Sequence, residues 1–347
     1  MNGKKNAYAQ AGVNRDIENE TKTGMASALE TSDPRVLNKI GAFASLYDGH
    51  FPEYEHPILV LKTEEPGTKQ LLAFQYDKAE SVCHDLVNHL VNDAIVMGAK
   101  PLSIQDCIIC GKVEKPIVLR MVNAFAEAAK NNECTLTGGE TSWQPGTIPE
   151  GTYVLTASIV GVVDKSKIID GSKIQKGDTV LALASSGVHT NGISLVRKIL
   201  ETNPDILNET IEGKSFIDTV LTPHRAYYTA LKDMFAKDSL VGLAHITGGG
   251  MQENLDRILP AGLDAEVDLS KVRVHPVFAT LKQYGKLEDA DMLRTFNMGV
   301  GIAAVVRPEF AEEFVAHMRG QGIEAYPIGI ITEGDTKVRF TGSLTWS

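Results

Sequence analysis

The sequence is an acidic chain of 347 residues with a formal net charge of −10. This length exceeds what one hydrophobic core usually serves, so two domains are expected. A composition of 43% hydrophobic and 22% charged residues is that of an ordinary globular protein, neither disordered nor fibrous. The acidic balance argues against nucleic acid as a partner, because no basic surplus exists to neutralise phosphates.

The lack of a recognisable targeting signal and the small number of cysteines both indicate a cytoplasmic location. The first ten residues carry two lysines but no apolar run, and no later stretch is long enough to span a bilayer. We therefore expect a cytoplasmic protein with no membrane partner. Cys83, Cys107, Cys110 and Cys134 are too few for a disulfide framework in so long a chain. Cys107 and Cys110 form a C-x-x-C inside an apolar run with no second such pair, so we interpret them as structural thiols.

Apolar patterns from residue 57 onward predict a mixed α/β (α+β) fold. The predicted elements of the first half are strand 57–62, strand 70–74, helix 81–97, strand 102–109, helix 116–131, strand 135–137 and strand 153–163. A polar run, DGSKIQKGD, then predicts a domain boundary near residue 170, giving domains 1–170 and 171–347. The second half contains predicted strands 180–184, 299–306 and 326–331 and helices 192–201, 223–235, 251–259, 275–284 and 308–319.

Acidic residues at the ends of separate elements are candidate metal ligands. Asp85, His89 and Asp93 share one side of an otherwise apolar helix, where a carboxylate needs compensation by a metal, a cap or a salt bridge. Further acids follow or lie in the strands, namely Glu64, Asp106 and Glu140. Convergence of Glu64, Asp93, Asp106 and Glu140 would suit Mg²⁺, which prefers oxygen ligands and substrate phosphates.

Three glycine-rich turns are candidate phosphate sites. They are TGGET at 137–141, SSGVHTNG at 185–192 and TGGG at 247–250, and the last two open predicted helices. A helix N-terminus preceded by glycines offers free N–H groups and the positive end of a dipole. The alternative is that the glycines only turn the chain. Neither a P-loop, a G-x-S-x-G nor an H-E-x-x-H motif occurs.

Eight segments in the same order resemble the phosphoribosylformylglycinamidine cyclo-ligase (aminoimidazole ribonucleotide synthetase) family over nearly the whole chain. They are YAQAGV (8–13), GAF (41–43), DLVNHLVNDAIVMGAKP (85–101), GGETSWQPG (138–146), IIDGSK (168–173), SSGVHTNGISLVRKIL (185–200), HITGGGMQENLDRILP (245–260) and RTFNMGVG (294–301). The resemblance implies two domains, with N-terminal strands of two subunits pairing into a barrel and a C-terminal α/β sandwich. It also implies a homodimer with ATP in a cleft near the subunit interface.

The resemblance further implies the reaction and the residues that perform it. The formyl-amide oxygen of formylglycinamidine ribonucleotide attacks the γ-phosphate of ATP, and a ring nitrogen then expels phosphate to close the imidazole of aminoimidazole ribonucleotide. Residues implied for Mg-ATP are Glu64, Gly67, Thr68, Lys69, Asn92, Asp93, Asp106, Gly138, Gly139 and Glu140. Residues implied for the substrate phosphate are Ser185, Ser186, His189, Thr190, Asn191, Thr247, Gly248, Gly249 and Gly250. Lys69 would act as a point charge in catalysis. His189 and His245 are the candidates for proton transfer, and the alternative for either histidine is a structural role.

The loop at 63–69 departs from the family pattern T-D-G-V-G-T-K. Glu64 keeps a carboxylate, but Glu65-Pro66 replaces Gly-Val, and Gln144 stands where the family often has Met. This motivates an alternative, a non-catalytic nucleotide-binding paralogue. A second alternative is an enzyme like thiamine-monophosphate kinase, from the same superfamily. Selenophosphate synthetase and the hydrogenase-maturation relative are disfavoured, because this chain lacks their N-terminal and C-terminal cysteines.

Overall fold

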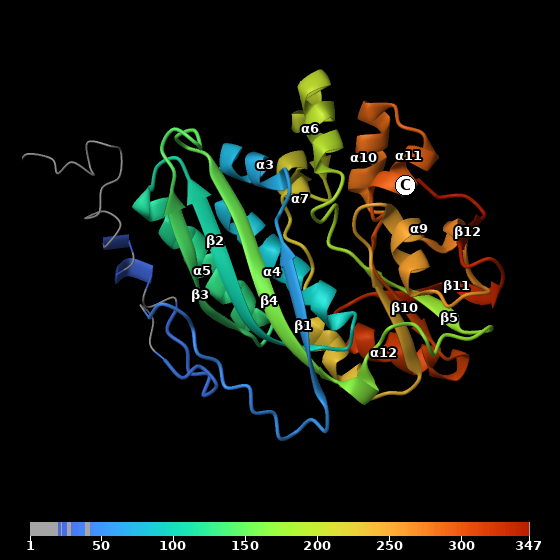
Figure 1. The fold of residues 1–347 in the computed structure, drawn as a ribbon. Coiled ribbons are helices and arrows are strands. Elements are labelled where there is room, and N and C mark those ends of the chain that lie inside the picture. The colour runs from blue at the N-terminus through green and yellow to red at the C-terminus, as the bar shows by residue number, and fades with distance from the viewer. Residues whose placement is uncertain (1–19, 22, 26–28, 39–41, 347) are drawn as a thin grey trace, which may run out of the picture.

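Two sheets organise the computed structural model, which describes residues 20–21, 23–25, 29–38 and 42–346 (Figure 1). The YAQAGV stretch at 8–13 and Gly41 lie outside the described residues. The first sheet has the order β1-β4-β2-β3 and the second the order β12-β9-β11-β5-β10-β8. The predicted mixed α/β class is therefore confirmed. Within the described part of the chain, no helix combines the length and apolarity needed to cross a membrane.

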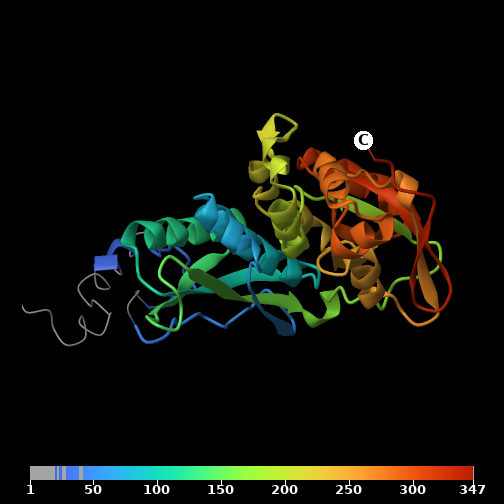
Figure 2. The ribbon, with the colours of Figure 1, turned by 90° about the horizontal axis from the view of Figure 1, so that it is seen from above.

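The N-terminal sheet is covered by helices on one face only. Its strands are β1 (Pro57–Glu64), β2 (Lys100–Cys110), β3 (Thr135–Trp143) and β4 (Tyr153–Asp164). Helices α3 (Lys69–Gln75), α4 (Ala79–Ile95) and α5 (Lys115–Asn131) belong to the same half, and Figure 2 shows α4 and α5 on one side of the sheet. Residues of β4 alternate between buried and partly exposed, as expected for a strand with one covered face.

Part of the C-terminal sheet is buried on both faces. It contains β5 (Thr179–Ala184), β8 (Leu240–His245), β9 (Leu263–Asp268), β10 (Val300–Val306), β11 (Ala325–Glu333) and β12 (Val338–Thr341). Its helices are α6 (Ile193–Thr202), α7 (Phe216–Val220), α8 (Tyr228–Leu231), α9 (Gly250–Leu255), α10 (Pro276–Gly285), α11 (Asp289–Thr295) and α12 (Ala311–Gly320). Every residue of β8 and β10 is buried, which requires cover on both faces. A separate two-stranded ribbon pairs β6 (Thr210–Ile211) with β7 (Lys214–Ser215).

Two predicted elements are wrong. The strand expected at 70–74 is helix α3, because a run of four apolar residues carries no period that separates helix from strand. The helix expected at 223–235 is limited to α8 and a 3₁₀ turn, and residues 222–227 are irregular. Strands β8, β9 and β12 had no predicted counterpart.

Polar residues of α4 hold the irregular segment 222–227 in place. Asn88 Nδ2 donates to the carbonyl of His224 at 2.7 Å, and Asn92 Nδ2 donates to the carbonyl of Arg225 at 2.8 Å. Tyr227 N donates to Asn92 Oδ1 at 3.3 Å. These side chains replace the hydrogen bonds that a helix would have supplied, and they dock the two halves of the chain together.

A buried ion pair reinforces this docking. Lys69 Nζ lies 2.9 Å from Asp85 Oδ2 and donates to the carbonyl of Thr222 at 3.0 Å, while His224 N donates to Asp85 Oδ1 at 2.7 Å. Burial lowers the pKa of Lys69 and raises the pKa of Asp85, and each charge opposes the shift of its partner. The pair therefore depends on mutual compensation.

We expect Asp85→Asn to destabilise the protein by about 3–5 kcal/mol, because it leaves the Lys69 charge buried without its partner. The double variant Lys69→Met/Asp85→Leu should recover most of that loss, since it removes both charges. Denaturant unfolding measures both values. Equal destabilisation by the single and double variants would show that the charges are not coupled.

Candidate functional site

The acids predicted at the end of β1 and in α4 meet at one point. The pairing of β1 with β4 sets Lys62 opposite Ile159 and Glu64 opposite Ala157, both on the face covered by α4. Lys62 Nζ lies 3.0 Å from Asp93 Oδ2 and 3.1 Å from Glu64 Oε2. The structure thus brings Glu64 and Asp93 together around a lysine ammonium that the sequence did not single out.

Asp93 also contacts His245 at the end of β8. His245 Nδ1 lies 2.7 Å from Asp93 Oδ1, so the ring donates there and its Nε2 carries the lone pair. Burial alone would raise the pKa of Asp93, but the hydrogen bonds from His245 and Lys62 hold that pKa below its usual range. Asp93 is therefore an ionised carboxylate at the junction of the two halves.

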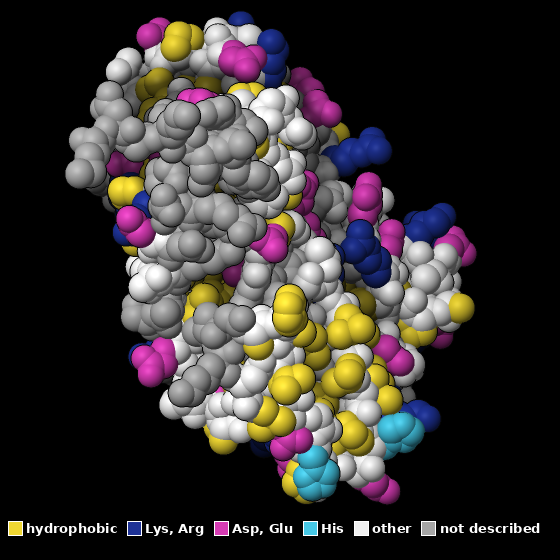
Figure 3. Space-filling model, turned by 60° about the vertical axis from the view of Figure 1, so that its left-hand side comes forward, with side chains coloured by type: hydrophobic (Ala, Val, Ile, Leu, Met, Phe, Trp, Pro, Cys, Tyr) yellow, Lys and Arg dark blue, Asp and Glu magenta, His cyan; other side chains and the backbone are white. Residues whose placement is uncertain are grey.

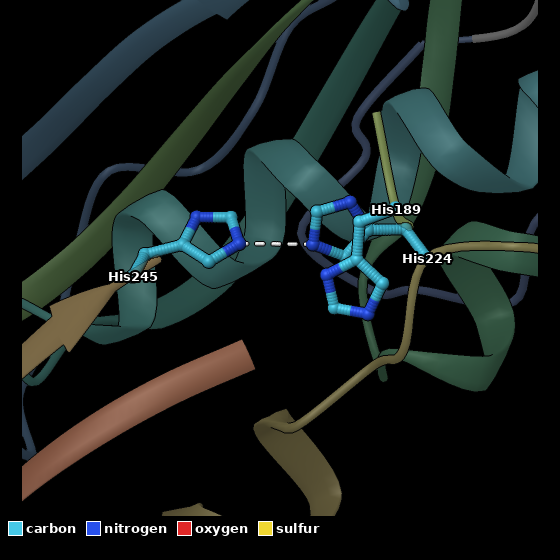
Figure 4. Close-up of side chains that lie close together, drawn as sticks. All are labelled: His189, His224 and His245. Carbon is cyan, nitrogen blue, oxygen red and sulfur yellow. Dashed lines mark hydrogen bonds between the residues drawn. The ribbon is translucent and has the colours of Figure 1, made fainter. Parts of the chain in front are cut away.

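Three more histidines lie behind Asp93 and are fully or nearly fully buried. His224 Nε2 lies 2.9 Å from His245 Nε2, and the His189 ring stacks on His224 with centroids 3.8 Å apart (Figure 4). Burial lowers the pKa of His89, His189 and His224, so all three are neutral at physiological pH. His224 then donates its Nε2 proton to His245, which extends the hydrogen-bonded chain from Asp93 inward.

Ligand atoms of His189, His224 and His245 lie within 4.8 Å of one another, as do those of His89, Asp93 and His245. The first trio is poorly suited to a metal. His189 Nε2 accepts a hydrogen bond from Ser186 N at 3.1 Å, so its Nδ1 carries the proton and has no partner among the described residues. Coordination through that Nδ1 would require the neutral ring to lose its one N–H proton.

The carboxylate pair fits Mg²⁺ better. Two oxygens, Glu64 Oε2 and Asp93 Oδ2, converge on one point that already holds a positive charge. Hard oxygen donors are the ligands that Mg²⁺ prefers, with waters and phosphates completing its shell.

The other two predicted metal ligands do not join this pair. Asp106 and Glu64 are both register partners of Ala157, so they share a face with β4 between them, roughly 10 Å apart. Gly139 of β3 pairs with Asp106 of β2, and the next residue, Glu140, pairs with Cys107. Successive side chains of a strand alternate between faces, so Glu140 points to the open face, opposite to Asp106. Within one chain, Glu140 is separated from Glu64 and Asp93 by the sheet itself.

Lys69 and Asn92 are also placed away from open space. The Lys69 side chain is fully buried against Asp85, and both amide atoms of Asn92 bond to segment 225–227. The geometry therefore makes them parts of the contact between the two halves. Thr68 Oγ1 lies 3.2 Å from Ser194 Oγ, and Gly67 takes a positive φ of 59° beside the Thr190 carbonyl. The loop after β1 thus touches the start of α6.

The turns at 185–192 and 247–250 lie side by side. A Cβ on Gly248 would stand 3.4 Å from Asn191 Oδ1, and the buried Nδ2 of Asn191 has no partner among the described residues. Thr190 Oγ1 contacts His89 Nδ1 at 3.1 Å, which connects the first turn to the acid pair. A buried amide donor without a partner, beside a glycine turn, can donate to a ligand oxygen.

Not every glycine of the TGGG turn serves a ligand. A Cβ on Gly250 would overlap the carbonyl oxygen of Leu293, and one on Gly249 would overlap the Glu253 side chain. Both glycines have positive φ, 89° and 63° for Gly249 and Gly250. Packing against neighbouring elements therefore accounts for these two, and Gly248 remains open toward Asn191.

Several structural residues of the site were not predicted. Asn254 Nδ2 donates to the carbonyls of Gly248 and Gly250 and its Oδ1 contacts Thr247, while Asn297 bonds to Ser185 Oγ and the Gly187 carbonyl. Ser186 Oγ donates to the Pro223 carbonyl at 2.7 Å. These contacts leave Ser185 and Ser186 engaged with protein groups. Asn297 falls inside the RTFNMGVG segment, so its role could have been sought there.

Asp106 is a buried carboxyl next to Gly139. A Cβ at Gly139 would overlap the Asp106 carboxylate, so only glycine fits there. Burial raises the pKa of Asp106 from 3.8 to about 7. The folded protein therefore keeps a proton that the unfolded chain releases above pH 3.8, and stability falls as the pH rises from 3.8 to about 7.

We expect Asp106→Asn to remove this penalty. The variant should melt about 2–4 °C higher than the wild type at pH 8, where the penalty is complete, with little gain at pH 4. Melting curves at the two pH values test this. The same shift at both would mean that the charge of Asp106 is not its cause.

Known proteins resemble this chain in sequence and fold. Residues 54–163 match the AIR synthase related protein N-terminal domain, and residues 175–341 match the corresponding C-terminal domain. A phosphoribosylformylglycinamidine cyclo-ligase of Bacillus mycoides (strain KBAB4) is 38% identical over 333 residues, 95% of this chain and 96% of the relative. One of Burkholderia cenocepacia (strain HI2424) is 41% identical over 327 residues, 94% and 93% of the two chains.

Solved structures share the fold at lower identity. E. coli HypE has a TM-score of 0.67 at 17% identity, covering 94% of each chain. Thiamine-monophosphate kinase from Stenotrophomonas maltophilia K279a has a TM-score of 0.65 at 15% identity, covering 95% of this chain and 96% of its own. The resemblance read from the eight sequence segments is confirmed by the full-length relatives, and the chain belongs to the AIR synthase related family, among the phosphoribosylformylglycinamidine cyclo-ligases.

Proposed function

We propose that this protein closes the imidazole ring of aminoimidazole ribonucleotide from formylglycinamidine ribonucleotide, using ATP and releasing ADP and phosphate, in purine biosynthesis. Curated relatives with this name cover nearly the whole chain at 38–41% identity. The observation that carries the proposal is the convergence of Glu64 and Asp93 beside the turn at 185–192. Such a site can hold a metal-bound triphosphate next to a sugar phosphate.

The cofactors proposed are ATP and Mg²⁺. One structural neighbour is a HypE in complex with ATP, with a TM-score of 0.64 and 17% identity. Glu64 and Asp93 would hold Mg²⁺, which when bound neutralises charge on the triphosphate. Gly248 and Asn191 would face the substrate phosphate, because they are the open glycine and the unpartnered amide of the two adjoining turns.

His245 is proposed to position Asp93 rather than to meet the substrate itself. Its Nδ1 donates to Asp93 and its Nε2 accepts from His224, so neither nitrogen is free. The bond to His245 keeps Asp93 ionised and fixes the direction of its second oxygen toward Lys62. His189 is enclosed and neutral, so proton transfer by either histidine would require a rearrangement of the site.

A turnover assay with formylglycinamidine ribonucleotide, ATP and Mg²⁺ tests the function. The wild type should release ADP and phosphate only when the ribonucleotide is present. Asp93→Asn should abolish Mg-ATP binding and turnover, because it removes the charge that holds the metal, and it should also lower the melting temperature, because that charge pairs with Lys62 and His245 in the folded protein. ATP binding without ADP release by the wild type would instead support the non-catalytic paralogue. An unaltered nucleotide affinity in Asp93→Asn would remove Asp93 from the site.

The open face of the N-terminal sheet is proposed as a homodimer interface. The location proposed for the protein is the cytoplasm. Leu59 and Leu61 of β1 are 55% and 70% exposed and share this face with Val160 of β4. A gathering of hydrophobic side chains is visible on the surface in Figure 3. An exposed apolar strand at a sheet edge is a liability unless another surface covers it.

We expect Leu61→Asp to shift the protein from dimer to monomer, because it places a charge in the contact. Sedimentation velocity measures the change. Leu207→Asp, at an exposed leucine outside both main sheets, serves as the control and should remain dimeric. A wild type that sediments as a monomer would contradict the proposed interface.

A further inference from the structure

Lys62 holds the position where the two metal-binding acids converge. We propose that Lys62 is a resident counter-cation of the Glu64–Asp93 pair and that a divalent metal binds there only by displacing its ammonium. This inference rests on the proposed function for the identity of the site. It identifies Lys62 as a residue that controls metal binding, because its ammonium must leave before the metal can bind.

The position of Lys62 follows from the strand. Lys62 and Glu64 are two residues apart in β1, so their side chains leave on the same face, toward α4. Its Nζ contacts one oxygen of each acid, at 3.1 Å for Glu64 and 3.0 Å for Asp93. The ammonium therefore bridges two elements that no backbone hydrogen bond joins at this point.

His89 completes the surroundings of the ammonium. Its Nε2 lies 3.6 Å from Asp93 Oδ2 and 3.8 Å from Glu64 Oε2, and its Nδ1 contacts Thr190 Oγ1. Two carboxylates this close repel one another, so the charge of Lys62 compensates them when no metal is present.

A metal and the ammonium cannot occupy this point together. Mg²⁺ binds carboxylate oxygens at about 2.0–2.1 Å, which would place it against an ammonium that already contacts both oxygens. Like charges a few ångströms apart repel strongly in a partly buried site. The Lys62 side chain is 38% exposed, so its flexible stem has solvent to move into.

The consequence is that the free protein binds divalent metal weakly. The metal must compete with a charge that belongs to the chain, whereas a metal that arrives with a nucleotide brings further phosphate contacts of its own. Lys62 would thereby favour the metal–nucleotide complex over the bare ion. Removing the ammonium should expose the acid pair to the metal alone.

Titration with Mn²⁺, followed by the EPR signal of the free ion, tests this without nucleotide or substrate. Mn²⁺ shares the preference of Mg²⁺ for octahedral oxygen sites. Lys62→Met should bind Mn²⁺ at least roughly tenfold more tightly than the wild type, because a repelling charge is gone. Lys176→Met, which removes an exposed lysine paired with Glu333, is the matched control and should bind as the wild type does.

A double variant assigns the metal to the acid pair. Lys62→Met/Asp93→Asn should lose the gain of Lys62→Met, since one of the two oxygens is no longer charged. Lys62→Gln, which keeps a polar side chain, provides the same comparison if the methionine variant does not fold. Circular dichroism melting establishes that each variant is folded.

Equal or weaker Mn²⁺ binding by Lys62→Met and Lys62→Gln would overturn the proposal. A gain that persists in the double variant would also overturn it, because the metal would then sit elsewhere. Failure of the ring-closing function is seen separately, in the turnover assay. If Lys62 competes with the metal but the protein shows no turnover, the role of Lys62 stands and the ligase function is rejected. If the protein turns over but Lys62 does not compete with the metal, the ligase function stands and the role of Lys62 is rejected.

Discussion

The burial of polar side chains along α4 is the constraint on which the arrangement of the site depends. Asp85, Asn88 and Asn92 lie on a helix whose remaining surface is packed in the core, so each must find a partner. They find it in the backbone of segment 222–227 and in Lys69. This satisfies the helix and at the same time fixes the C-terminal half against the N-terminal half. Asp93, one residue after Asn92, is thereby brought to β8 and His245.

The electrostatics of the site follow from that docking. Contact between the two halves buries His189 and His224, and burial lowers their pKa so that both are neutral. His245 and Lys62 lower the pKa of Asp93 and keep it ionised. The result is a neutral, buried cluster of imidazoles behind a charged carboxylate that faces outward. A carboxylate held from behind in this way keeps its direction when its outer partner changes, which suits exchange of an ammonium for a metal. The same cluster explains why His189 tolerates a positive φ of 57°, since its ring is packed on His224 and bonded to Ser186.

Sequence patterns predicted the long periodic elements and the proximity of Glu64 and Asp93. They did not predict the features whose conformation depends on tertiary contacts. The amphipathic segments that became α5 and α6 carry their own signal, and so does the buried strand β10. Segment 223–235 has the composition of a helix, but α4 offers its backbone better partners. Glu140 was misplaced because a register shift between Ile104 and Gln105 decides which face it takes, and spacing alone does not reveal a bulge. Lys62 was overlooked because no motif draws attention to a lysine within a strand.

The unusual loop after β1 is compatible with the backbone that the site requires. A glycine is needed where φ is positive, and in this loop that position is Gly67, which the chain retains. Glu65 is not among the described residues with positive φ, so a side chain there carries no backbone strain. The backbone N–H of Glu65 donates a hydrogen bond to Glu64 Oε1 at 3.1 Å. This bond helps to fix the carboxylate that faces Lys62. Proline at 66 restricts the loop further before Thr68, which is the N-cap of α3. The exchange of Gly-Val for Glu-Pro therefore stiffens the approach to the acid pair without distorting it, and this removes the structural ground for regarding the chain as a binder that has lost its reaction.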